Sequence, residues 1–407
     1  MKYLQMSLLV LFLLISSSTI SATNCLGGTR NISKEEADDI EIEGQLRILN
    51  KKPVKTIINE IGGVIDCIDI HKQPAFDNPL LKDHKIQMNP SSIPGETRTK
   101  NVLASSIFHG LQRERCPSGT VPIRRTTRED LVNTKYFVKT AGLKGANGYP
   151  NTVYHYVFAE EVISGKKYFG AAASMTIHNL TLDLDQFSTS QIWIVNSSPE
   201  ETNGIEFGIM KYPGVAGDSL PRLFGYWAST DGHNPTGCYN MLCPGFVQVS
   251  KDVFLNNQFT HSSTYGEKVY EAYLAVYRAQ DTGHWWLRVG PNADVTEDVG
   301  YWPNELFTTL KTSAVSVRYG GFVGSLSQES KPPMGNGYFP QLNDHRKTAF
   351  MRLLRYANET GNLVDVDSRS VKTTSTAKLE CYSIIYARQI ERWENHMVYG
   401  GPGGMCH

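Results

Sequence analysis

The side chains of this chain that most readily form covalent bonds are its seven cysteines. None of them stands in a CxxC pair. In an exported chain, cysteines usually form disulfides, so we expect structural cross-links and no metal site. We expect three pairs, Cys67 with Cys116, Cys238 with Cys243 and Cys381 with Cys406, with Cys25 left over.

A second candidate for chemistry is Glu206, which lies in a short alternating run. In a strand, Ile205, Phe207 and Ile209 would share one face. Glu206 and Gly208 would share the other face, where a glycine would leave space for the backbone of a substrate. From the pattern alone, an ordinary solvated glutamate is the favoured interpretation.

The sequence motifs of several other catalytic and binding sites are absent from this chain. The chain contains no G-x-S-x-G, no P-loop and no H-E-x-x-H, and we expect no cofactor. Lys+Arg and Asp+Glu number 40 each, so the formal net charge is zero. This balance argues against a nucleic-acid-binding protein, which needs a basic face.

The N-terminus has the pattern of a secretory signal peptide. Lys2 precedes an apolar run from Leu8 to Ile15, and small polar residues lead to a cleavage point after Ala22. The apolar run is shorter than the roughly 20 residues that span a bilayer. We therefore expect removal of residues 1–22 and a secreted, extracellular protein. Four N-x-S/T sequons are candidate glycosylation sites, at Asn31, Asn179, Asn196 and Asn358.

The part of the chain beyond Pro150 is patterned for strands. Apolar residues alternate there in short runs that turn residues separate. The runs are Val153–Phe158, Ala171–Ile177, Gln191–Val195, Phe246–Val249, Tyr273–Tyr277 and Trp285–Val289. We predict an all-β fold, an antiparallel β-sandwich.

The residues before the sandwich indicate a small α+β domain. A capping pattern predicts a helix over Lys34–Leu49, and Gly62 and Gly63 lie between two strand-like runs, as in a hairpin. The Gly-rich stretch Thr140–Asn151 is the natural boundary. We divide the exported chain into an N-terminal domain at 23–145 and the sandwich at 146–407.

Six runs of residues resemble a known family, the plant neprosins. The first two resemble its activation segment and the rest its catalytic domain. They are Asp66–Lys82, Cys116–Arg125, Ser190–Trp193, Thr236–Gln248, Gly300–Pro303 and Pro333–Pro340. The resemblance covers almost the entire exported chain. It implies a secreted glutamic peptidase made as a zymogen, with a β-sandwich catalytic domain, two catalytic glutamates and a preference for cutting after proline.

The resemblance also places the two catalytic positions. The segment Asn203–Gly208 matches the family's first glutamate motif, so Glu206 is its counterpart. The second glutamate of the family lies in a Trp-Gly-Gly-Glu-Val motif. The matching residues here are Tyr319–Val323, which put Phe322 where that glutamate belongs.

The replacement at Phe322 weakens the expectation of an active enzyme. A peptidase without a nucleophile or metal needs one group to activate water and another to protonate the leaving amine. Phe322 can do neither, and Glu329 on the following loop is a poor substitute because loops seldom hold catalytic geometry. We expect a weakened or inactive peptidase. The alternative is a non-catalytic binder of proline-rich peptides or wall polysaccharide in the same cleft.

Two further residues are candidates for substrate binding. Gln191 and Trp193 would share a strand face opposite Ile192 and Ile194, on a strand that the resemblance places beside the cleft. The glutamine would orient water, and the indole would stack on a prolyl ring. For Trp193, plain core packing is an equally good interpretation. The partner implied is a peptide or protein.

Overall fold

The computed structural model of the chain describes residues 34–91, 104–109, 114–133, 153–198, 200–216, 218, 220–230, 236–325, 330–377, 379–388 and 393–405. Some expectations fall outside these residues, namely the signal peptide, the 140–151 boundary, Cys25, Asn31, Glu329 and Cys406. No helix within the described ranges combines the length and the apolar character needed to cross a membrane.

Seven antiparallel strands form the first sheet, called here the seven-stranded sheet. In spatial order they are β17 (Val371–Ser375), β4 (Val153–Glu161), β14 (Ser316–Ser325), β6 (Gln186–Ser197), β7 (Thr202–Lys211), β8 (Arg222–Thr230) and β9 (Thr236–Tyr239). Strand β6 therefore lies near the middle of the sheet, between β14 and β7.

The second sheet, called the nine-stranded sheet, is also antiparallel. Its strands are, in order, β10 (Val247–Gln248), β13 (Glu297–Trp302), β12 (Trp285–Gly290), β11 (Glu271–Arg278), β5 (Gly170–Thr176), β15 (Ala349–Ala357), β19 (His396–Gly400) and β18 (Ser383–Ala387), with β16 (Leu363–Asp365) paired to β15. Strand β10 is one edge of this sheet.

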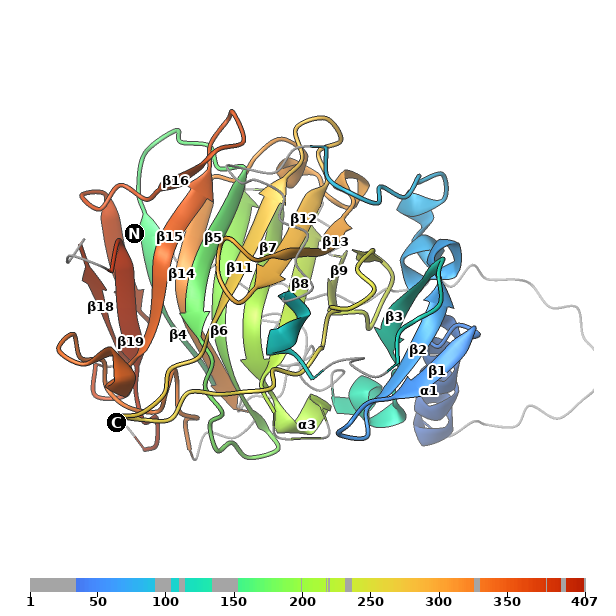
Figure 1. Cartoon of the computed structure of the whole chain (residues 1–407), viewed down its shortest axis with the longest axis horizontal. Helices are drawn as coiled ribbons and strands as arrows, with labels where there is room; N and C mark the ends of the chain where they lie inside the picture. The colour runs from blue at the N-terminus through green and yellow to red at the C-terminus, as the bar shows by residue number, and fades with distance from the viewer. Residues whose placement is uncertain are drawn as a thin grey trace, which may run out of the picture.

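The two sheets stack face to face, as Figure 1 shows, and the predicted antiparallel β-sandwich is confirmed. Alternate residues of each strand point into one shared core. Ile192 and Phe207 fill it from the seven-stranded sheet, and Leu274 and Val276 from the other. Side chains at the intervening positions of β6 and β7 consequently lie on the outer face of the seven-stranded sheet.

The N-terminal elements form a separate small sheet beside the sandwich (Figure 1). Helix α1 spans Lys34–Leu49, as predicted, and β1 (Lys55–Ile58), β2 (Val64–Asp69) and β3 (Thr120–Arg124) form the sheet. Gly62, at φ +82°, makes the turn of the predicted hairpin, a conformation that favours glycine.

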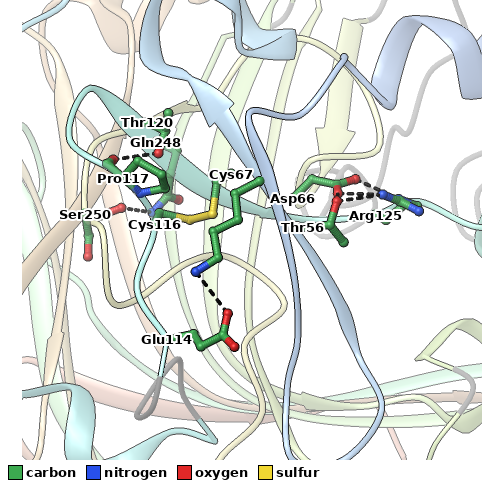
Figure 2. Close-up of a disulfide and its surroundings, with 11 residues drawn as sticks. Thr56, Asp66, Cys67, Glu114, Cys116, Pro117, Thr120, Arg125, Gln248 and Ser250 are labelled. Atoms are coloured by element: carbon green, nitrogen blue, oxygen red, sulfur yellow. Dashed lines mark hydrogen bonds and ion pairs between the residues drawn. A yellow bond between two sulfur atoms is a disulfide. The ribbon is translucent and has the colours of Figure 1, made fainter.

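The predicted disulfide between Cys67 and Cys116 is present and joins β2 to the segment before β3 (Figure 2). Beside it, the guanidinium of Arg125 donates to both carboxylate oxygens of Asp66, at 2.6 and 2.7 Å. A two-point contact of this kind holds both partners in one geometry. The disulfide and the ion pair together fasten β3 to β2.

The segment between β2 and β3 packs into the sandwich. Its described residues include four 3-10 helices, η1 (Ile70–Lys72), η2 (Pro74–Asp77), η3 (Pro79–Leu81) and η4 (Ala104–Ile107). The side-chain amide of Gln73 donates to the carbonyl oxygen of Gln248 and accepts from its N–H, at 3.1 and 2.8 Å. This pair of bonds is what a neighbouring strand would make, so Gln73 satisfies the exposed edge strand β10. Phe108 is fully buried in the shared core, 4.6 Å from Phe259 between ring centroids.

We expect Phe108→Ala to destabilise the sandwich, because its ring is part of the shared core. The loss should be about 3 to 5 kcal/mol in the free energy of unfolding. Urea unfolding followed by tryptophan fluorescence measures it. Leu80→Ala, at an exposed position of the same segment, should change stability by less than about 0.5 kcal/mol. An unchanged sandwich transition in Phe108→Ala would contradict the shared core.

Candidate functional site

The structure brings the four expected site residues onto the outer face of the seven-stranded sheet. Glu206 on β7 lies directly opposite Trp193 on β6. Gln191 lies two residues before Trp193 and therefore on the same face. Phe322 on β14 lies opposite Thr189 of β6, on the other side from Glu206. The two expected catalytic positions thus flank β6, four residues apart in register.

Two glycines flank Gln191 across the sheet, Gly208 on β7 and Gly320 on β14. A Cβ atom at Gly208 would lie 2.1 Å from the carbonyl oxygen of Ser190, and one at Gly320 would lie 1.9 Å from that of Val157. Close approach of neighbouring backbones thus requires both glycines. We expected Gly208 to make room for a substrate. In the structure, the close spacing of β7 and β6 is what requires a glycine at this position.

A line of hydrogen bonds crosses β6 from Glu206 toward Phe322. Nε2 of Gln191 donates to Oε2 of Glu206 at 2.6 Å. The hydroxyl of Thr189 donates to Oε1 of Gln191 at 2.7 Å and accepts from the N–H of Phe322 at 3.2 Å. The same hydroxyl lies 3.1 Å from the carbonyl oxygen of Phe322, so its one proton can serve either acceptor.

Thr189 was not among the residues expected in the site. Its position, two residues before Gln191 in one strand, places both side chains on the same face. That spacing is the signal by which the sequence would have identified it.

The carboxyl group of Glu206 has an altered acidity. Burial raises its pKa to about 7, against the opposing effects of the Gln191 hydrogen bond and the positive charge of Arg318. Arg318 itself is paired with Glu160, at 3.2 Å between Nε and Oε1, and lies over the ring of Phe158. Glu206 can therefore hold a proton at mildly acidic pH and release it near neutrality.

Phe322 fills its position with an aromatic ring. It is 5% exposed, and its ring centroid lies 5.0 Å from that of Phe187 and 5.7 Å from that of Tyr154. It belongs to a cluster on the outer face of the sheet, which we call the aromatic cluster, made of Phe158, Phe187, Trp193, Met210, Tyr212, Val215, Phe224 and Phe322. Among the described residues, Arg318 is the only charged group that shifts the pKa of Glu206.

Trp193 is packed within this aromatic cluster. It is 9% exposed, and its ring lies 6.2 Å from that of Phe158, inclined by 59°. In this conformation the indole is part of the buried packing of the aromatic cluster. Stacking on a substrate would need the two rings to separate.

Three of the cysteines expected to form cross-links in the sandwich lie within the described residues. Cys238 and Cys243 are bonded, as predicted, and close the loop after β9. Cys381 also takes part in a disulfide.

The sequon asparagines differ in what their side chains contact. Asn179 is exposed and accepts from Lys211, whereas Asn358 accepts from the turn that follows it. The amide nitrogen of Asn196 donates to the carbonyl oxygens of Thr309 and Ser313, at 3.3 and 2.6 Å. A glycan on Asn196 would have to be accommodated at a nitrogen already bonded to the protein. Glycosylation at all four sequons stays a prediction.

A group of metal-type ligands lies elsewhere, where the N-terminal segment meets the nine-stranded sheet. His84, His284 and Glu305 each offer one atom, and these atoms lie within 4.8 Å of one another. The sequence analysis missed this group because the three residues are far apart in the chain and form no spacing motif.

Comparison with known families supports the resemblance found in the sequence. The family model described as Neprosin matches residues 184–402, and the model described as Neprosin activation peptide matches residues 56–166. The first match contains Gln191, Trp193, Glu206 and Phe322. The second contains the disulfide Cys67–Cys116 and His84.

Solved structures with a similar arrangement include two peptidases. Scytalido-glutamic peptidase with a transition-state analogue inhibitor is 8% identical, with a TM-score of 0.33 over 61% of this chain and 98% of that one. SCP-B of the Eqolisin family, in complex with the tripeptide Ala-Ile-His, is 8% identical, with a TM-score of 0.31 over 62% and 97%. Scores this low describe a loose likeness of strands and say nothing of activity.

We expect Gln191→Ala to raise the pKa of Glu206 further. The substitution removes the donor that stabilises the charged carboxylate, whereas burial still favours the neutral form. Carbon-detected NMR titration of the Glu206 carboxyl group measures the change, with Gln280→Ala at an exposed position as the control. A pKa that stays constant or falls would show that the hydrogen bond has no influence on the site.

Glu206 should also make folding stability depend on pH. Its pKa is about 7 in the folded chain and close to 4.5 in the unfolded chain, so in this range the folded chain holds a proton that the unfolded chain releases. Raising the pH from 4.5 through 7 therefore lowers stability. Urea unfolding of the natural protein and of Glu206→Gln, each at pH 5 and at pH 8, isolates the contribution of Glu206 to the free energy of unfolding. The natural protein should lose more stability than the variant, and equal losses would argue against the raised pKa.

Proposed function

Since this chain belongs to the neprosin family, we propose that it is a secreted peptide-binding member with little or no peptidase activity. Its binding surface would be the outer face of the seven-stranded sheet, around Glu206 and Gln191. The observation that carries this proposal is the burial of Phe322 among aromatic rings, at the position where the sequence resemblance places the second glutamate.

The chemistry of peptide hydrolysis supports the loss of activity. One group must activate water while a second protonates the leaving amine. Glu206, with its pKa of about 7, suits one of these roles. A phenylalanine supplies no proton, and general acid or base assistance is typically worth about 10²- to 10⁴-fold in rate. Glu206 alone would therefore support slow turnover at most.

The composition of the outer face supports a peptide as the ligand. Tyr154, Tyr156 and Tyr226 are half-buried there. Aromatic rings of this kind pack well on prolyl rings. Glu206 and Gln191 add a carboxyl group and an amide, which can bond to the backbone of a bound peptide. Export through the signal peptide at residues 1–22 would place this binding outside the cell.

We expect the natural protein to bind a proline-rich peptide without cleaving it at acidic pH. Phe322→Glu should create a second carboxyl group across β6 from Glu206 and raise the cleavage rate by at least about 10²-fold. Adding Glu206→Gln to that variant should remove the gain. Phe322→Leu is the matched control, because it changes packing without adding a carboxyl group. Calorimetry measures binding, and chromatography of the products measures cleavage.

Three outcomes separate the alternatives. Rapid cleavage by the natural protein that survives Glu206→Gln would overturn the site. A folded Phe322→Glu variant that binds peptide without cleaving it would show that further catalytic groups have been lost. Binding of a wall polysaccharide in place of the peptide would favour the carbohydrate alternative.

A further inference from the structure

We propose that His84, His284 and Glu305 form a binding site for one zinc-type divalent cation. The site lies between the N-terminal segment, which supplies His84, and the nine-stranded sheet, beside which His284 and Glu305 lie. The inference stands on the geometry of these side chains and is independent of the proposed peptide binding.

The distances suit a shared cation. Nδ1 of His84 lies 3.2 Å from Oε1 of Glu305, and Nδ1 of His284 lies 3.9 Å from Oε2 of the same carboxylate. Zinc binds nitrogen and oxygen at about 2.0 to 2.2 Å in a tetrahedron, so its neighbouring ligand atoms lie about 3.3 to 3.6 Å apart. Small side-chain rotations would bring the three donors to this geometry.

Local structure holds each ligand in place. His84 follows η3, and the backbone N–H of His84 donates to the carbonyl oxygen of Leu81. His284 directly precedes β12, and Glu305 belongs to the 3-10 helix η5 (Asn304–Leu306). The side chain of His84 is 2% exposed and that of Glu305 is 43% exposed, so an ion can enter from the carboxylate side.

Tyr301 contacts both histidines. Its hydroxyl oxygen lies 2.9 Å from Nε2 of His84, and it accepts the N–H of Gln87 at 2.9 Å. The Tyr301 ring stacks on His284, with centroids 5.0 Å apart and an angle of 15°. Metal-bound histidines commonly use the second ring nitrogen to bond to such a partner, which fixes the ring and its tautomer.

Coordination displaces two existing hydrogen bonds. One joins Nδ1 of His84 to Oε1 of Glu305 at 3.2 Å, and the cation would bind these two atoms in its place. The N–H of Asn304 now donates to Nδ1 of His284 at 3.1 Å, and a cation at this nitrogen would take its lone pair. Asn304 is half-buried, so water can accept the released N–H.

The donor set determines the class of cation. Two imidazoles and one carboxylate suit zinc and related transition metals, whereas calcium and magnesium prefer oxygen ligands. Three protein ligands leave one position for water. Because His84 comes from the N-terminal segment, the bound ion would tie that segment to the sandwich.

The test is calorimetric titration of the full, tag-free chain with zinc chloride near neutral pH. The natural protein should bind one equivalent. Glu305→Gln should lose this binding, because the amide oxygen still accepts a hydrogen bond from His84 but is a poor zinc ligand. Tyr301→Phe should weaken it by about 10- to 100-fold. Glu267→Gln, at an exposed position, is the matched control and should bind as the natural protein does.

Cobalt provides a second measurement on the same proteins. One equivalent of Co²⁺ should give the visible absorption bands of a tetrahedral site in the natural protein and in Glu267→Gln, and not in Glu305→Gln. Failure of the natural protein to bind zinc would overturn the proposal. Binding that is equally tight in Glu305→Gln would also overturn it, because the ion would then lie elsewhere.

Discussion

The alternation of side chains along β6, the strand between β14 and β7, is the constraint on which the candidate site depends. Ile192 and Ile194 point into the core between the sheets, which forces Gln191 and Trp193 to the outer face. A slip of one residue in register would bury the amide and expose the isoleucines. Packing of the hydrophobic core therefore sets the direction of the polar groups on the other side of the sheet.

Close packing of strands then determines how these polar groups meet. The two glycines paired with Gln191 permit close strand spacing: Gly208 lets β7 approach β6, and Gly320 lets β14 approach β4. Gln191 reaches Glu206, and the hydroxyl of Thr189 lies 2.7 Å from the amide oxygen of Gln191. Burial raises the pKa of Glu206 to about 7, because it outweighs the opposing effects of the Gln191 hydrogen bond and the positive charge of Arg318.

Phe322 changes the character of this face. A glutamate at that position would have to be partly desolvated beside Phe187 and Tyr154, at a cost to stability. A phenylalanine packs there with favourable ring contacts, at centroid distances of 5.0 and 5.7 Å. The chain thus has an aromatic contact at the position where the sequence resemblance predicts an acid. The N-terminal segment also stabilises the sandwich, because its side chains complete the core and form hydrogen bonds with edge strand β10.

Much of this protein was predictable from its sequence. Helix Lys34–Leu49, the hairpin at Gly62, the alternating strands and two disulfides depend on local patterns or on cysteine spacing. The shared strand face of Gln191 and Trp193 and the position of Phe322 also follow from period-two alternation and motif matching. Such features need only neighbouring residues or a known motif.

Only the tertiary structure decided which distant residues meet. The bond from the N–H of Phe322 to Thr189 required the pairing of β14 with β6, and the burial of Phe108 required the N-terminal segment to dock on the sandwich. The meeting of His84 with His284 and Glu305 joins three parts of the chain that share no motif. Contacts of this kind arise from the stacking of sheets and the path of a connecting segment, and these depend on the whole core at once and leave no periodic trace in the sequence.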